Sequence, residues 1–206
     1  DIELLLDIGS HKGETIKTFV KNFNIKNIYS FEASASNYAI LKNNIKKIQE
    51  KYTKCNINIF NIGIGNLNTD KIFYDLSDSN SSTFNTINKN SSYFKRKNKI
   101  LSFFFKKDFF VKESLVKQVR LCDFINQNKL GKIDILKIDT EGYELEVLKG
   151  LEDKINDIKF IYFEHHYDNM IEKNYKFSDI HDLLTSKGFN KSFKIIFVSD
   201  IFGTLL

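Results

Sequence analysis

The chain has 206 residues, of which 42% are hydrophobic and 28% are charged, and its formal net charge at pH 7 is +5. This length suits one domain over residues 1–206, and no apolar run approaches the roughly 18 residues that a membrane helix needs. The charge is compatible with an acidic ligand but does not indicate nucleic acid, and two cysteines without C-x-x-C spacing indicate a reducing, cytoplasmic compartment without structural zinc.

Apolar runs alternate with helical periods along the chain, which is typical of an α/β protein with a parallel, doubly wound sheet. A mainly parallel, seven-stranded sheet is predicted, with strands at residues 2–6, 28–31, 57–62, 133–138, 159–163, 193–198 and 201–206, of which the last two would form a closing antiparallel pair. Helices on both faces of this sheet are predicted at residues 14–23, 38–52 and 144–149 and from Ser178 to Gly188. Ser34 and Ser36 are candidate caps for the second helix.

One segment, at about residues 76–117, interrupts this alternation and is predicted to be a variable insertion. Residues 76–92 are rich in Ser, Asn and Thr, which predicts a long loop. Residues 93–117 are basic and aromatic, which fits either extra strands packed on the core or a surface for nucleic acid or a membrane. Acidic residues interrupt the positive charge and favour the extra strands.

A glycine loop, Asp7 to Gly13, directly follows the first predicted strand. Glycine allows close backbone approach and positive φ, and such a loop at the carboxyl end of a parallel strand commonly holds a nucleotide-like ligand. Asp7 repels pyrophosphate but suits a cationic centre, such as the amino and sulfonium groups of S-adenosylmethionine, although it could also cap the helix. His11 stands where a dinucleotide fingerprint has glycine, which disfavours NAD.

Two further acids end predicted strands, Glu32 after the second and Asp139 after the fourth. Because parallel strands end at the same edge of a sheet, both acids are expected to meet the glycine loop in one crevice. Glu32 can accept hydrogen bonds from both hydroxyls of a ribose; the alternative is a solvated loop acid.

Residues 136–150, LKIDTEGYELEVLKG, resemble the signature block of the FkbM-type methyltransferases, and four shorter stretches fit the same family in order and spacing, namely residues 7–13, 31–32, 121–124 and 163–166. The resemblance spans nearly the whole chain. It implies a Rossmann-like class I methyltransferase fold, as a single methyltransferase domain, that transfers a methyl group from S-adenosylmethionine to a hydroxyl of a sugar, glycan or related small metabolite.

The same resemblance implies a set of cofactor contacts. Asp7, Gly9 and Gly13 would contact the methionine part, Glu32 the ribose, and Asn61 and Ile62 the adenine, while Ser10, Phe31 and Asp139 complete the predicted cofactor site. Residues 81–83 resemble a small serine cluster that the family often has near its site.

The candidates for catalysis are polar residues at the ends of the fourth and fifth predicted strands, namely Asp139, Glu141, Glu164, His165 and His166. A hydroxyl acceptor must lose its proton, and a positioned carboxylate or imidazole suits that task. The histidines come first because an imidazole titrates near neutral pH. The three acids could instead gather a divalent cation, but their spacing alone does not establish this, so no metal ligand is assigned. Lys137 is expected to neutralise a neighbouring acid such as Glu164.

Two alternatives stay open from the sequence. The basic segment 95–117 suggests an RNA-modifying methyltransferase, which would bind RNA in a salt-dependent manner. A non-catalytic module of the same fold would bind a nucleotide or a partner without turnover. The favoured partner is a small-molecule or glycan acceptor, and nucleic acid and a membrane span are disfavoured.

Overall fold

The computed structural model describes residues 1–76, 82–105, 111–165 and 170–193. The chain divides into two compact units, residues 1–175 and residues 176–206. The first unit contains the sheets and most of the helices, and the second contains helix α6 (Phe177–Ser186). None of the helices in these described ranges is both long and apolar enough to cross a membrane.

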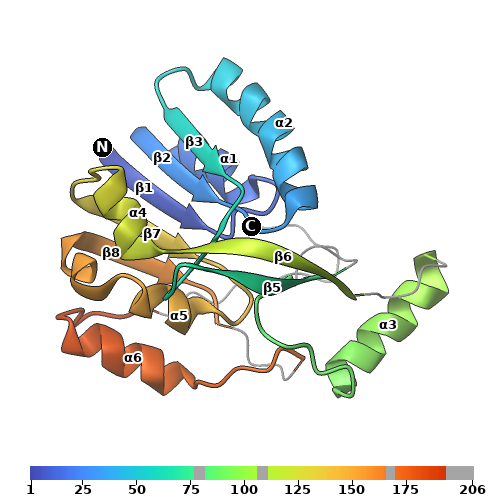
Figure 1. Ribbon diagram of the computed structural model, residues 1–206. Helices are drawn as coiled ribbons and strands as arrows, with labels where there is room; N and C mark the ends of the chain where they lie inside the picture. Colours follow the sequence, from blue (N-terminus) through green and yellow to red (C-terminus); the bar gives the residue numbers. More distant parts are fainter. Residues whose placement is uncertain (77–81, 106–110, 166–169, 194–206) are drawn as a thin grey trace. The chain divides into compact units, whose positions relative to one another are not determined.

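A five-stranded sheet lies at the centre of the first unit, with strand order β3-β2-β1-β7-β8 (Figure 1). Its strands are β1 (Ile2–Ile8), β2 (Ile25–Phe31), β3 (Asn56–Phe60), β7 (Ile133–Ile138) and β8 (Ile158–Phe163). Every pairing within this sheet is parallel, as predicted, so all five strands end at the same edge. In the register, Asp7 of β1 lies between Ser30 of β2 and Lys137 of β7.

Helices cover both faces of this sheet, as predicted. They are α1 (Glu14–Asn22), α2 (Ala35–Lys51), α4 (Leu121–Gln127), α5 (Glu144–Lys149) and the 3₁₀ helix η1 (Glu152–Asp157). On one face, Ile16 of α1 and Leu41 of α2 pack with Ile28 of β2 in a buried apolar cluster. On the other face, Phe124 of α4 lies edge-on against Phe31, with ring centroids 4.7 Å apart. Apolar stripes at helical spacing therefore face the sheet from both sides.

A second sheet has the strand order β4-β6-β5, and of its strands the sequence predicted only part of β6. Its strands are β4 (Gly63–Gly65), β5 (Thr69–Leu76) and β6 (Val111–Arg120), with β5 and β6 antiparallel. The prediction of a single seven-stranded sheet is therefore not confirmed: five parallel strands stand beside a separate three-stranded sheet. The predicted closing pair at 193–206 lies, apart from Phe193, outside the described residues.

The insertion differs in part from its prediction. Residues 93–105 belong to helix α3 (Ser92–Phe105), so the expectation of extra strands is wrong there and correct only for the part within β6. Ser91 explains the helix start, because its hydroxyl accepts a hydrogen bond from the Phe94 N–H at 3.1 Å and caps the first turn. Phe94 is buried in a small cluster with Leu76 and Ile87.

The capping residues of helices α2 and α6 agree only in part with those predicted from the sequence. Ser34 caps α2 as predicted, accepting from the Asn37 N–H. Helix α6, in contrast, begins before the predicted cap: Ser178 lies inside it, and Asp179 accepts from the N–H of Lys176 at the cap position at 2.8 Å. Gly188, with φ +90°, lies just beyond its end, as predicted.

Candidate active site

A cleft lies at the carboxyl ends of β1, β2 and β7. Its lining comprises Ile8, Gly9, His11, Phe31, Glu32, Ala33, Asn37, Ile62, Gly63, Ile64, Phe73, Ser82, Phe84, Asp139, Thr140 and Glu141. The structure thus brings Gly9, Glu32 and Asp139 together, at the edge where the strand ends were expected to converge.

Gly9 allows the loops after β1 and β7 to approach each other. Its φ is +78°, and a Cβ atom at this position would lie 1.8 Å from the backbone oxygen of Asp139, so no other residue fits without movement. The Gly9 N–H donates to the Phe31 oxygen at 2.9 Å, which joins the same loop to β2. Ser10 is buried beside it, with its hydroxyl 3.0 Å from the Asp7 oxygen.

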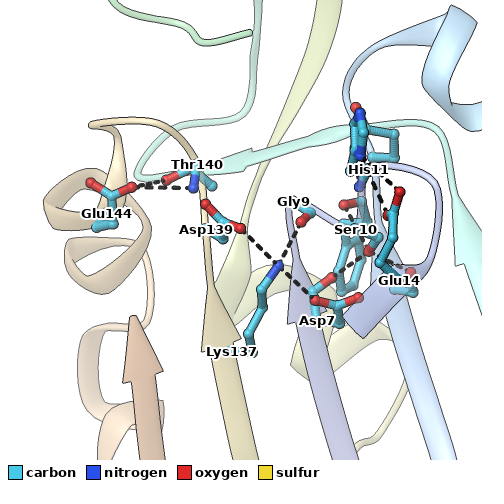
Figure 2. A network of polar contacts seen from close by, with 12 residues as sticks. Asp7, Gly9, Ser10, His11, Glu14, Lys137, Asp139, Thr140 and Glu144 are labelled. Carbon is cyan, nitrogen blue, oxygen red and sulfur yellow. Dashed lines mark hydrogen bonds and ion pairs between the residues drawn. The ribbon is translucent and has the colours of Figure 1, made fainter. Parts of the chain in front are cut away.

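Beneath the cleft, a buried lysine joins two acids from adjoining strands (Figure 2). The Lys137 ammonium lies 3.1 Å from Asp7 Oδ1 and 3.5 Å from Asp139 Oδ2, and it donates to the Gly9 oxygen at 2.7 Å. Burial alone would lower the pKa of Lys137, but the charges of Asp7 and Asp139 outweigh it and raise that pKa. Lys137 therefore neutralises neighbouring acids, as expected, but these acids are Asp7 on β1 and Asp139 at the end of its own strand rather than the suggested Glu164.

This arrangement also determines what Asp7 does. The Asp7 side chain is fully buried and does not line the cleft, so its charge acts on a ligand only from below the loop. Asp139, whose side chain is one third exposed, connects the same network to the cleft surface. Gly13 is likewise outside the lining; it holds the N-cap position of α1 with φ +91°.

Glu32 is the buried acid of the cleft lining. Its carboxylate accepts from the backbone N–H of His11 at 2.7 Å and of Ser34 at 2.8 Å, and its residue is 6% exposed. Burial raises the pKa of Glu32 to about 7, against the lowering effect of these hydrogen bonds and of Lys137. A carboxylate has about four lone-pair sites, so Glu32 retains capacity for donors from a ligand.

The residues predicted for the adenine lie next to this acid. Asn61 is exposed, and its amide donates to the backbone oxygens of Glu32 at 2.8 Å and Ala33 at 3.2 Å. This contact fixes the turn after β3, whereas Ile62, the next residue, lines the cleft itself.

The loop from β7 to α5 contains the acids closest to the cleft on the other side. Glu141 lines the cleft with φ +51°, and Gly142 follows with φ +90°. A left-handed conformation costs a residue such as Glu about 1–2 kcal/mol, and such strain collects at functional sites. The cost is met locally, because Glu144 Oε1 accepts from the N–H groups of Thr140 and Gly142 at 3.1 and 3.0 Å.

The remaining catalytic candidates are farther from the lining. Glu164 is exposed, and its N–H donates to the Ile138 oxygen at 3.1 Å. His165 is half-buried, with its ring centroid 6.0 Å from that of Tyr175. Neither is among the described residues that line the cleft, and His166 lies outside the described residues. Within those residues, no group of three His, Cys, Asp or Glu side chains is placed to hold a metal ion.

The sequence did not identify the side of the cleft that comes from the second sheet. Phe73 of β5 and Phe84 pack edge to face, with centroids 5.0 Å apart, and Phe84 lies against Gly63, where a Cβ would be 2.2 Å from its ring. Thr83 pairs with Tyr74 of β5 in an isolated antiparallel bridge, which places Ser82 and Phe84 at the cleft. In the sequence, only the serine cluster at 81–83 indicated that the segment after β5 lies near the site.

Fold and site together define an α/β protein whose ligand cleft lies at the carboxyl ends of a parallel sheet. Residues 7–191 match the model of the methyltransferase FkbM domain, and the chain belongs to the FkbM methyltransferase family. Among solved structures it is similar to the methyltransferase FkbM from Methylobacillus flagellatus KT, at 16% sequence identity and a TM-score of 0.49. That match covers 76% of this chain and 30% of the other. No curated protein matches the chain.

Proposed function

We propose that this chain is an S-adenosylmethionine-dependent O-methyltransferase that acts on a hydroxyl of a sugar, a glycan or a related small metabolite in the cytoplasm. The observation that carries the proposal is Glu32, a buried carboxylate with spare acceptor sites that lines the cleft of an FkbM-family domain. Two ribose hydroxyls would supply the donors that this carboxylate lacks.

The rest of the cleft fits the same cofactor. Ile62, Ile64 and Phe84 offer an apolar surface to a base, and the loop at Gly9 allows close backbone approach to the ligand. The acids in and below the cleft outnumber its one buried cation, Lys137, which favours a positively charged ligand over a pyrophosphate. When bound, S-adenosylmethionine supplies a methyl group activated by a cationic sulfur, so alignment of the acceptor provides much of the rate.

Proton removal from the acceptor is assigned to the side of the cleft after β7. Asp139 and Glu141 are the candidate bases that line the cleft, and Glu141 is placed first because its left-handed backbone is the kind of strain that collects at functional sites. Glu164, His165 and His166, which follow β8, are further candidates for the base, and single substitutions of each rank them by the loss in turnover.

Calorimetry and labelled turnover test the proposal together. S-Adenosylmethionine and S-adenosylhomocysteine should each bind more tightly than NAD, and the wild-type protein should transfer a labelled methyl group to a member of a sugar panel. Glu141→Gln should reduce turnover about 10²–10⁴-fold with little change in cofactor affinity. Glu146→Gln, at a half-buried glutamate of α5 that pairs with Lys149 and does not line the cleft, is the matched control. Tighter binding of NAD would overturn the cofactor assignment, and cofactor binding without any turnover would favour a non-catalytic module.

RNA is a second candidate acceptor because of helix α3. Its Lys95, Arg96 and Lys99 are exposed, and Tyr93 beside them is 45% exposed, a combination that suits a nucleic acid backbone and its bases. Retention on RNA that declines steeply between 50 and 200 mM salt and exceeds retention on heparin would support this acceptor. Equal retention on both polyanions would leave the sugar hydroxyl as the acceptor.

A further inference from the structure

Glu144 is a fully buried carboxylate that the proposed function does not use. It is the first residue of α5 and has no exposed surface. Its Oε1 accepts from the Thr140 N–H at 3.1 Å, the Thr140 hydroxyl at 3.1 Å and the Gly142 N–H at 3.0 Å (Figure 2 shows the contacts to Thr140). Its Oε2 accepts from the hydroxyl of Tyr175. A buried charge is tolerated only when it is satisfied in this way.

The donors to Oε1 surround one residue of the cleft. Thr140 and Gly142 flank Glu141, so both backbone N–H groups next to this left-handed residue point to the same oxygen. A loop that is anchored on both sides of one residue has few alternative conformations, and the direction in which Glu141 leaves the backbone is thereby fixed. The same loop is also held from the segment that follows β5, since Asn85 donates to the Gly142 oxygen at 2.5 Å.

The donor to Oε2 connects Glu144 to the other catalytic candidates. Burial, and then the negative charge of Glu144, raise the pKa of Tyr175, so its hydroxyl stays protonated and donates. The Tyr175 ring lies next to that of His165. Residues just before Tyr175 pair with the segment that follows β5. The Glu172 N–H donates to the Thr86 oxygen at 2.9 Å, and Ile171 forms an antiparallel bridge with Ile87.

We propose that Glu144 is the positioning residue of this active site, holding Glu141 on the acceptor side of the cleft through the loop backbone and His165, after the end of β8, through Tyr175. This inference rests on the proposed function for its catalytic meaning. Glu144 touches neither cofactor nor acceptor, so it should affect the rate of methyl transfer and the titration of His165 more than the affinity for the cofactor.

The test uses the full chain with Glu144→Gln, Glu144→Asp and Tyr175→Phe, and with Glu146→Gln as the control from the same helix. Thermal unfolding identifies variants that fold. S-Adenosylhomocysteine is the binding probe, and the rate of methyl transfer is measured on the sugar that the wild type methylates fastest. Nuclear magnetic resonance follows the N–H signals of Thr140 and Gly142 and the pH titration of the histidine rings in every variant, which requires no acceptor.

Glu144→Gln, which keeps one acceptor oxygen, should bind S-adenosylhomocysteine within about threefold of the wild type but lose about 10–100-fold in kcat. Its Thr140 and Gly142 signals should move, and Tyr175→Phe should shift the titration of His165. Glu144→Asp should not restore kcat, because its shorter side chain cannot reach the same donors.

Unchanged signals and an unchanged His165 titration in the folded variants would overturn the inference, as would a loss of cofactor affinity as large as the loss in kcat. Failure of the proposed function has a different signature. In that case the wild type binds no S-adenosylhomocysteine and methylates no sugar, while the resonance measurements still decide whether Glu144 positions the loop.

Discussion

Two buried glutamates, Glu32 after β2 and Glu144 at the start of α5, lie in or next to the loops of the cleft. The surrounding donors compensate their charges to different extents. Glu144, beside β7, accepts hydrogen bonds on both oxygens from three protein residues and is wholly enclosed. Glu32, after β2, accepts from two backbone N–H groups and faces the cleft, and its pKa is raised to about 7. A ligand can add hydrogen bonds to Glu32 but not to Glu144, which is the basis for proposing that Glu32 binds the ligand and that Glu144 positions the loop.

The largest expected effect concerns Lys137, which compensates a third buried acid, Asp7. Replacement of Lys137 by Met leaves the charge of Asp7 without its cation, and the free energy of unfolding should fall by about 3–5 kcal/mol. Urea denaturation at pH 7 measures this change. Lys149→Met, which removes an exposed pair with Glu146, should cost less than about 1 kcal/mol. Equal effects of the two substitutions would show that Asp7 does not depend on Lys137.

Glu32 should make the stability of the protein depend on pH. Its pKa is about 7 in the folded protein and 4.5 ordinarily, so between these values the folded chain holds a proton that the unfolded chain lacks. The stabilising contribution is complete below pH 4.5 and is lost as pH rises through 7, by up to about 3 kcal/mol. Urea denaturation of the wild type and of Glu32→Gln at pH 5 and pH 8 measures it. A stability difference between the two proteins that is the same at both pH values would contradict the raised pKa.

The next largest effect tests whether Glu32 binds the cofactor. Glu32→Ala should weaken S-adenosylhomocysteine by about 1.5–3 kcal/mol, the value of hydrogen bonds to a charged group. Glu14→Gln is the matched control, because Glu14 also accepts from a backbone N–H of the glycine loop but is exposed. Calorimetry on both variants gives the answer, and an unchanged dissociation constant in Glu32→Ala would remove this acid from the site.

Cofactor affinity itself should change with pH. Ribose hydroxyls need the ionised carboxylate as acceptor, so binding expels the proton that Glu32 holds below pH 7. The affinity for S-adenosylhomocysteine should therefore rise with pH, by up to about tenfold per unit, and level off above about pH 7. Calorimetry in buffers of different ionisation enthalpy would detect the released proton. The same slope in Glu32→Gln would assign the pH dependence to another group.

The smallest expected effect comes from Asp75, a neighbour of Glu32. Asp75 Oδ2 accepts from Ser34 at 2.9 Å and Oδ1 from Ser82 at 2.8 Å, and its negative charge contributes to the raised pKa of Glu32. Asp75→Asn keeps an acceptor for the serines but removes the charge, so the midpoint of the pH dependence of binding should fall by less than about one unit. A midpoint that stays in place would mean that the charge of Asp75 does not contribute to this pKa.

Much of the parallel sheet could be predicted because its signals are local. Continuous apolar runs such as that in β1, and apolar stripes at helical spacing such as that in α1, identify each element without knowledge of its neighbours. The second sheet could not be predicted in this way. Strand β4 has three residues, two of them glycine, so its length does not distinguish it from a loop. Strands β5 and β6 place apolar Ile72 and Leu115 on exposed positions, which obscures the alternation expected of a half-buried strand.

By itself, the sequence determined that Gly9, Glu32 and Asp139 would meet, because parallel strands that end at one edge must bring their following loops together. Only the tertiary structure decided that Lys137 pairs with Asp7, that Phe84 lines the cleft, and that Glu144 holds the loop around Glu141. Most of these contacts join residues that are far apart in the sequence. Which charged or aromatic side chains meet is decided by how the strands and loops pack against each other. The spacing of residues along the chain therefore does not predict these side-chain contacts.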